Sequence, residues 1–116
     1  MLRHIVPFFI EKEPVDNPGT LTVTAQRISG RNPYQTNVTV VDPDGIRGIT
    51  SAIYTSAVDG AVSDRTTQLT RVDANTFSTG NRALRNARWQ RGSVTVTYVD
   101  GTTNQTHRLT ATWNIV

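Results

Sequence analysis

The chain has 116 residues, a formal net charge of +3 and no cysteine. This length suits one domain that buries about two-thirds of its unfolded surface around a single core. Hydrophobic residues make up 36% and charged residues 18% of the chain, a balance that excludes a disordered protein. The chain has no run of about 18 apolar residues, which excludes a helical membrane span. The absence of cysteine excludes a disulfide-stapled fold, thiol catalysis and cysteine-ligated metal sites.

Residues 1–18 form an N-terminal arm that precedes the regular part of the sequence. Pro7 discourages a helix there, and the charged residues 11–13 stand where a signal peptide would have small residues, so we expect no export by a signal peptide. Burying the apolar side chains of the arm would contribute about 7–15 kcal/mol, which ordering its backbone would cancel. We therefore expect the arm either to add a first strand to its own domain or to clamp a neighbouring subunit by strand addition. Its bulky apolar residues are Ile5, Val6, Phe8, Phe9 and Ile10.

The remaining residues, 19–116, have the composition and rhythm of an all-β domain. By count, the whole chain has 19 Thr and 13 Val, side chains that suit a pleated sheet and lose rotamer freedom in a helix. Turn signals recur at roughly the 8–12-residue spacing of a sandwich or barrel. Strands are predicted, in chain order, around residues 21–25, 38–40, 49–57, 66–72 (polar, at a sheet edge) and 76–78. A crossing loop with a helical turn is predicted over 81–89.

A C-terminal β-hairpin is the strongest local prediction. Apolar and polar residues alternate with a period of two on both arms, so that one face packs on a core and the other faces water. A turn at Asp100-Gly101 separates the two arms. The residues assigned to the buried face are Val94, Val96 and Tyr98 on the first arm and Leu109, Ala111, Trp113 and Ile115 on the second.

Two segments resemble strand-and-turn units of bacterial and phage immunoglobulin-like domains. They are VTVVDPDGI at 38–46 and GSVTVTYVDG at 92–101, and the resemblance extends over about residues 20–115. It implies an immunoglobulin-like β-sandwich of about seven antiparallel strands. It also implies that Tyr98 acts as a corner tyrosine whose hydroxyl bonds to backbone near the crossover. The Cys…Trp…Cys pattern of antibody domains is missing, which removes an immune-receptor function.

The sequence contains no residue set that indicates catalysis or a cofactor. No nucleophile elbow, Ser/His/Asp order or glycine-rich phosphate loop is present, so we expect a non-enzyme. His107 has no partner at metal-ligand spacing and is interpreted as a paired or exposed histidine. The series Asp42-x-Asp44-Gly45 opens like a calcium loop but is better explained as a turn. We expect no metal, and the alternative is calcium held by Asp42, Asp44 and Asp100.

A run of arginines around a tryptophan is the second candidate for partner contact. It is either a basic surface for an acidic partner or a solvated crossing loop in which Leu84 and Trp89 close the core. A spacing of three residues does not keep side chains on one face of a helix or strand. The small net charge gives no indication of nucleic acid binding. The candidate residues are Arg82, Arg85, Arg88, Trp89 and Arg91.

The resemblance and the arm together suggest a non-enzymatic virion structural protein. We expect a capsid decoration or cement protein of a bacteriophage, made in the host cytoplasm, that binds the major capsid protein, other virion proteins or further copies of itself. We expect neither nucleic acid nor membrane as a partner. One alternative is a phage tail or baseplate accessory protein. Another is a bacterial cell-surface module for glycan or protein, which would expose Trp89 together with Tyr34 or Tyr54.

Overall fold

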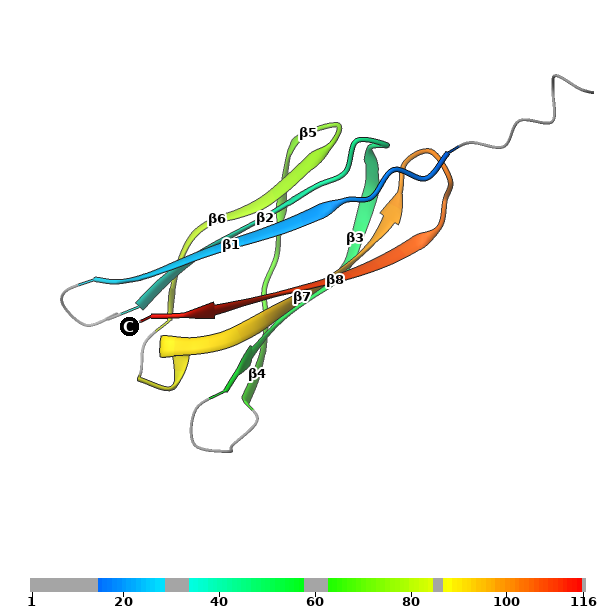
Figure 1. Ribbon diagram of the computed structural model, residues 1–116. Helices are drawn as coiled ribbons and strands as arrows, with labels where there is room; N and C mark the ends of the chain where they lie inside the picture. Colours follow the sequence, from blue (N-terminus) through cyan, green and yellow to red (C-terminus); the bar gives the residue numbers. More distant parts are fainter. Residues whose placement is uncertain (1–14, 29–33, 58–62, 85–86, 116) are drawn as a thin grey trace, which may run out of the picture.

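The computed structural model describes residues 15–28, 34–57, 63–84 and 87–115 (Figure 1). These residues form eight β-strands and one short 3₁₀ helix, η2. The elements are β1 (Thr20–Arg27), β2 (Tyr34–Val41), β3 (Ile46–Ser56), β4 (Ser63–Thr66), β5 (Thr70–Asp73), β6 (Thr76–Leu84), η2 (Ala87–Gln90), β7 (Arg91–Asp100) and β8 (Thr106–Asn114).

The strands build two four-stranded sheets in which all pairs are antiparallel. The first sheet has the order β1-β2-β6-β5 and the second has the order β4-β3-β7-β8. Along one side of the molecule the edge strand β1 runs beside the edge strand β8 (Figure 1). The prediction of an all-β protein is confirmed, and the two sheets enclose a single core as in a β-sandwich.

The core follows the alternation of the sequence. Every second residue of β2 and β7 is buried, which is the pattern of strands that turn one face to a core and the other outward. In β3 the buried face is that of Ala52 and Tyr54. The buried hydrophobic residues are Tyr34, Val38, Val40, Ile46, Ala52, Tyr54, Phe77, Leu84, Trp89, Val94, Val96, Tyr98 and Trp113.

The predicted C-terminal hairpin is present with the expected faces. Strands β7 and β8 pair so that Val96 stands opposite Leu109 and Tyr98 opposite His107. Directly opposed residues lie on the same face of a sheet, so these pairs share the core side. Ile115 lies one residue beyond β8, where its N–H donates to the carbonyl oxygen of Gln90 at 2.8 Å.

The predicted polar strand over 66–72 is wrong as a single element. Its residues divide between β4, which ends at Thr66 and pairs with β3, and β5, which starts at Thr70 and pairs with β6. The chain therefore passes from one sheet to the other within three residues. The segment has two apolar side chains, of which Leu69 packs against the core and Val72 is exposed. Both short strands lie at sheet edges, where few side chains need be buried. This division gives eight strands where about seven were expected.

The crossing predicted over 81–89 occurs later than expected. Strand β6 continues to Leu84, and η2 supplies the helical turn before β7 begins in the other sheet. Trp89 in η2 stacks on Trp113 with ring centroids 6.5 Å apart, and both rings make T-shaped contacts with the ring of Tyr54. The indole N–H of Trp113 donates to the carbonyl oxygen of Trp89 at 2.9 Å. These contacts close one end of the core.

Candidate functional site

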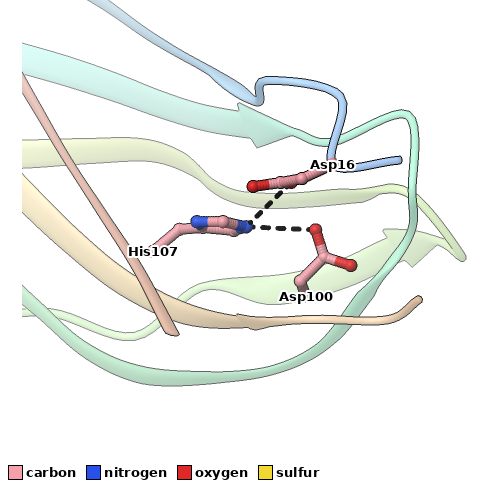
Figure 2. A group of neighbouring side chains, drawn as sticks. All are labelled: Asp16, Asp100 and His107. Carbon is pink, nitrogen blue, oxygen red and sulfur yellow. Dashed lines mark hydrogen bonds and ion pairs between the residues drawn. The ribbon is translucent and has the colours of Figure 1, made fainter. Parts of the chain in front are cut away.

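Among the described residues, a group of interacting polar side chains lies at the other end of the sandwich. There the turn after β2, the turn after β7 and the segment 15–19 that leads into β1 come together (Figures 1 and 2). We call this group the polar clasp. It consists of Asp16, Asn17, Asp42, Asp44, Tyr98, Asp100 and His107.

Turn chemistry places Asp42 and Asp44. The carbonyl oxygen of Asp42 accepts the N–H of Gly45 at 2.9 Å, and its side-chain Oδ1 accepts the N–H of Asp44 at 2.9 Å. Gly45 has φ of 85°, a conformation that glycine adopts without the steric cost that a Cβ adds. The Asp-Pro-Asp-Gly series is therefore a tight turn, as the sequence predicted. It directs one carboxylate inward and leaves the other nearer the surface.

Asp42 and Tyr98 form a buried hydrogen bond between the two sheets. Neither residue has exposed surface, and the Tyr98 hydroxyl donates to Asp42 Oδ2 at 2.6 Å. Burial raises the pKa of Tyr98, and the hydrogen bond to Asp42 raises it further. The predicted role of Tyr98 needs correction, because its hydroxyl bonds to a side-chain carboxylate and not to backbone. A buried carboxylate offers a stronger acceptor than a carbonyl group.

Asp100 is the second fully buried carboxylate of the clasp. Its Oδ1 accepts the backbone N–H groups of Thr102 at 2.7 Å and Thr103 at 2.8 Å. Its Oδ2 lies 3.1 Å from Nε2 of His107. Burial by itself raises the pKa of this carboxyl, but the backbone donors of Thr103 and Thr102 and the side chain of His107 outweigh it. The result is a pKa lowered from 3.8 to about 2.

His107 joins two carboxylates from different parts of the chain. Its Nε2 lies 3.1 Å from Asp100 Oδ2 and 3.2 Å from Asp16 Oδ1 (Figure 2). The contact with Asp100 is a hydrogen bond, and the contact with Asp16 is an ion pair when the imidazole is protonated. Desolvation raises the pKa of Asp16 and the charge of Asp100 adds to that rise, while the charge of His107 opposes it. The arrangement agrees with the interpretation of His107 as a paired histidine.

Asn17 and Gly19 fasten the leading segment on either side of a proline. Asn17 donates from its backbone N–H to Asp44 Oδ2 and from its side-chain amide to Oδ1, both at 2.8 Å. Gly19 lies against the Tyr98–Asp42 pair so closely that a Cβ there would collide with the Tyr98 hydroxyl. Residues 15–19 are thus attached to the sandwich by side chains of both sheets.

The clasp brings together the three residues of the calcium alternative. Carboxylate oxygens of Asp42, Asp44 and Asp100 lie within 4.8 Å of one another, and so do ligand atoms of Asp16, Asp100 and His107. Both buried carboxylates, however, already accept hydrogen bonds from protein donors. A cation would have to displace the Tyr98 hydroxyl or the imidazole N–H. In this arrangement the group works as a structural hydrogen-bond network.

Nothing in the sequence indicated that Asp16 and Asn17 belong to a site. They stand in a short polar stretch before a proline and a glycine, which reads as an ordinary turn. Their partners lie 27 residues or more away along the chain, and only the pairing of the sheets brings them near. The turn motif at 42–45 was the one part of the clasp that residue spacing could reveal.

The residues predicted for partner contact differ in exposure and location. Arg82, Arg88 and Arg91 are exposed, on β6, in η2 and at the start of β7. Trp89 is only 5% exposed and belongs to the core, so its ring offers no free face to a partner, which corrects that prediction. Outside the described residues lie Ile5, Val6, Phe8, Phe9, Ile10 and Arg85.

The aromatic platform expected for a glycan-binding module is not exposed. Trp89, Tyr34 and Tyr54 are each at most 5% exposed and lie in the core. The Tyr54 hydroxyl is engaged with the hydroxyl of Thr36 at 3.2 Å. The planar face that a sugar ring would stack on is therefore not available from these three residues.

Fold and site define an all-β protein of two antiparallel sheets whose polar end fastens the segment leading into β1. Comparison with protein-family models, with curated proteins and with solved structures found no match. Within the part of the chain that the structure describes, no helix has the length and apolar character of a membrane span.

Proposed function

We propose that this chain is a non-enzymatic virion structural protein, a decoration or cement protein of a bacteriophage capsid built on an immunoglobulin-like sandwich. Its partners would be the major capsid protein and other virion proteins. The observation that carries the proposal is the attachment of residues 15–19 to the sandwich through Asp16, Asn17 and Gly19. Val15 lies at this end and is exposed, so the apolar residues that precede it in the sequence are joined to a fixed point.

Fixing residues 15–19 lowers the entropic cost of binding a partner through the N-terminal arm. Binding through a peptide segment costs conformational entropy for each residue that becomes ordered. Asp16 and Asn17 already hold the segment 15–19 through an ion pair and two hydrogen bonds, so that part of the cost is met within the free protein. The five bulky apolar residues of 1–14 could then bury their surface on a shell protein, by strand addition or in a groove.

Repetition on a symmetric particle would convert modest contacts into stable attachment. Each copy would need only a weak site, because many copies and many sites act together on one shell. The exposed Arg82, Arg88 and Arg91 lie towards the other end of the sandwich from residues 15–19 and could add polar contacts at a second place on the shell. The buried carboxylates of the clasp are held in hydrogen bonds, which suits a structural role better than a chemical one.

Rebinding to stripped particles tests the proposal. Purified protein is mixed with phage particles from which it has been removed, and bound protein is measured after sedimentation and located by electron microscopy. We expect the wild type to rebind to the shell and a variant lacking residues 1–14 to lose most binding while keeping its melting temperature. Failure of the wild type to rebind, or equal binding by the truncated variant, would contradict the proposal. Density on the tail instead of the shell would make it a tail accessory protein.

A further inference from the structure

The side of the sandwich opposite the β1–β8 contact carries a cleft of about 250 Å³. It opens between β4 of one sheet and the last residues of β6 in the other. Tyr54 and Leu84, both buried, contribute to its lining. The full lining consists of Tyr54, Arg65, Thr66, Thr67, Gln68, Arg82, Ala83 and Leu84.

Strand register explains why two arginines from different sheets meet at this cleft. Arg65 of β4 stands opposite Tyr54 of β3, and Arg82 of β6 stands opposite Thr36 of β2. Opposed residues share a face, and both Tyr54 and Thr36 point into the core. The Thr36 hydroxyl donates to the Tyr54 hydroxyl across the sheets. Thr36 and Tyr54 therefore contact each other, and Arg82 and Arg65 lie on the neighbouring strands beside them. Both arginines line the same cleft between the sheets.

The positive charge in the cleft has no acidic counterpart in its lining. None of the lining residues is Asp or Glu, and among the described residues neither Arg65 nor Arg82 forms a hydrogen bond or ion pair. Arg71 differs, because its guanidinium donates to the carbonyl oxygen of Ile46 at 2.8 Å and lies over the ring of Phe77. Within the described residues, two guanidinium groups without partners therefore line one polar cleft.

Backbone groups at the cleft are also available for pairing. Residues 81–84 of β6 pair only with β2 within the described residues, and β4 pairs only with β3. An unpaired strand edge presents alternating N–H and C=O groups to an incoming extended chain. The opening therefore combines a strand edge with two cations.

We propose that this cleft binds an extended acidic segment of a protein partner, with a carboxylate held between Arg65 and Arg82. Guanidinium groups match carboxylates in a bidentate geometry, and the free edge of β6 offers backbone hydrogen bonds to the same segment. A nucleic acid fits less well, because its backbone would need a longer track of cations than two arginines in 250 Å³. The inference goes beyond the proposed virion function and uses none of residues 1–14.

An NMR titration of the full chain tests the cleft. The probes are the capped peptide acetyl-Ala-Glu-Ala-Glu-Ala-amide, its Gln-for-Glu counterpart and inorganic phosphate. We expect the Glu peptide to shift the Arg65 and Arg82 side-chain signals and the Thr66 and Ala83 amides, and to bind about tenfold tighter than the Gln peptide, the factor that about 1.4 kcal/mol gives. Arg65→Gln and Arg82→Gln should each weaken binding by a similar factor.

Arg108→Gln is the matched control. Arg108 is also an exposed arginine on a strand, but it stands opposite Thr97 on the outer face of the second sheet. It should change affinity by less than about twofold. No shifts at the cleft, equal affinity for the Gln peptide, tighter binding of phosphate, or an equal loss in Arg108→Gln would overturn the inference. Since particle rebinding depends on residues 1–14 and this titration on the cleft, failure of one leaves the other interpretable.

Discussion

Asp42 and Asp100 are carboxylates without exposed surface, and each needs hydrogen-bond donors at defined positions. A buried carboxylate is tolerated only when donors replace the water that it loses. Asp42 receives a hydroxyl and a backbone N–H, and Asp100 receives two backbone N–H groups and an imidazole. Each donor comes from a defined place in the fold. The hydrogen bonds therefore fix the positions of these residues more strictly than apolar packing would.

Replacing Tyr98 by Phe removes one donor from Asp42 and leaves the ring in place. We expect the free energy of unfolding to fall by about 1.5–3 kcal/mol, the range for hydrogen bonds to charged groups. The measurement is urea unfolding followed by tryptophan fluorescence. Tyr54→Phe is the matched control, because among the described residues its hydroxyl bonds to the neutral hydroxyl of Thr36, and should cost about 0.5–1.5 kcal/mol. Equal losses in the two variants would contradict a special role for Asp42.

Acid should weaken the fold through Asp100. Its pKa is about 2 in the folded protein, against 3.8 for an ordinary aspartate in the unfolded chain. The folded protein therefore favours the charged form of Asp100. The stabilisation is fully present above about pH 4 and is lost as the pH falls through 3.8 towards 2. Asp16 acts in the opposite sense, because its raised pKa favours protonation in the folded state.

Unfolding free energies measured between pH 6 and pH 2 check this expectation. The control is Asp100→Asn, which should be less stable at pH 6 and should show a shallower fall between pH 4 and pH 2. An identical slope in the variant and the wild type would show that another group causes the acid sensitivity.

At the scale of elements, residues 15–19 are held in place because their backbone lies close to side chains of the clasp. Gly19 packs against the Tyr98 hydroxyl and lies where a Cβ would be 3.0 Å from Asp42 Oδ2. Asn17 adds two hydrogen bonds to Asp44 in the turn after β2. The segment therefore depends on a small residue at one position and on an amide at another. Neither requirement comes from strand propensity.

Gly19→Ala should displace the segment or break the Tyr98–Asp42 hydrogen bond. We expect a loss of about 1–3 kcal/mol in unfolding free energy, as for other overpacked sites. Amide exchange of Asn17 should also become faster, since its bond to Asp44 depends on the same seating. Gly48→Ala is the matched control, because a Cβ there meets no atom within 4 Å, and should change stability by less than about 0.5 kcal/mol. A Gly19→Ala protein with unchanged stability and exchange would contradict the seating.

The elements also differ in how well the sequence predicts them. Strands with strict alternation, such as β7 and β8, were predicted with the correct faces. The division of the polar segment into β4 and β5 was not predicted, because it has too few apolar residues to indicate which sheet each part joins. The late end of β6 was missed because Ala83 and Leu84 are good helix formers, and pairing with β2 overrides that preference.

At the scale of the whole molecule, the two ends of the core are closed by different means. The clasp end is held by hydrogen bonds to buried charges. The opposite end is held by the aromatic contacts of Trp89, Trp113 and Tyr54. Aromatic packing of this kind contributes mainly through buried area and the fit of the rings. The tryptophan that was expected to contact a partner instead belongs to this closure.

Trp89→Ala should therefore act on stability. We expect a loss of about 3–5 kcal/mol in unfolding free energy, as for other large aromatic residues removed from a core. Thermal unfolding by circular dichroism measures it. The exposed neighbour Arg91, changed to Ala, should alter stability by less than about 0.5 kcal/mol. A Trp89→Ala protein that melts like the wild type would show that the ring is not part of the core.

Local pattern in the sequence was sufficient to determine the all-β class, the core faces of the regular strands and the tight turn at 42–45. These features depend on residues within a few positions of each other, where a period of two and turn chemistry act directly. The tertiary structure alone decided that Asp16 meets His107, that Tyr98 bonds to Asp42, and that Arg65 and Arg82 share a cleft. Such pairs depend on which strands become neighbours and in what register, and free energy summed over the whole core selects that pairing.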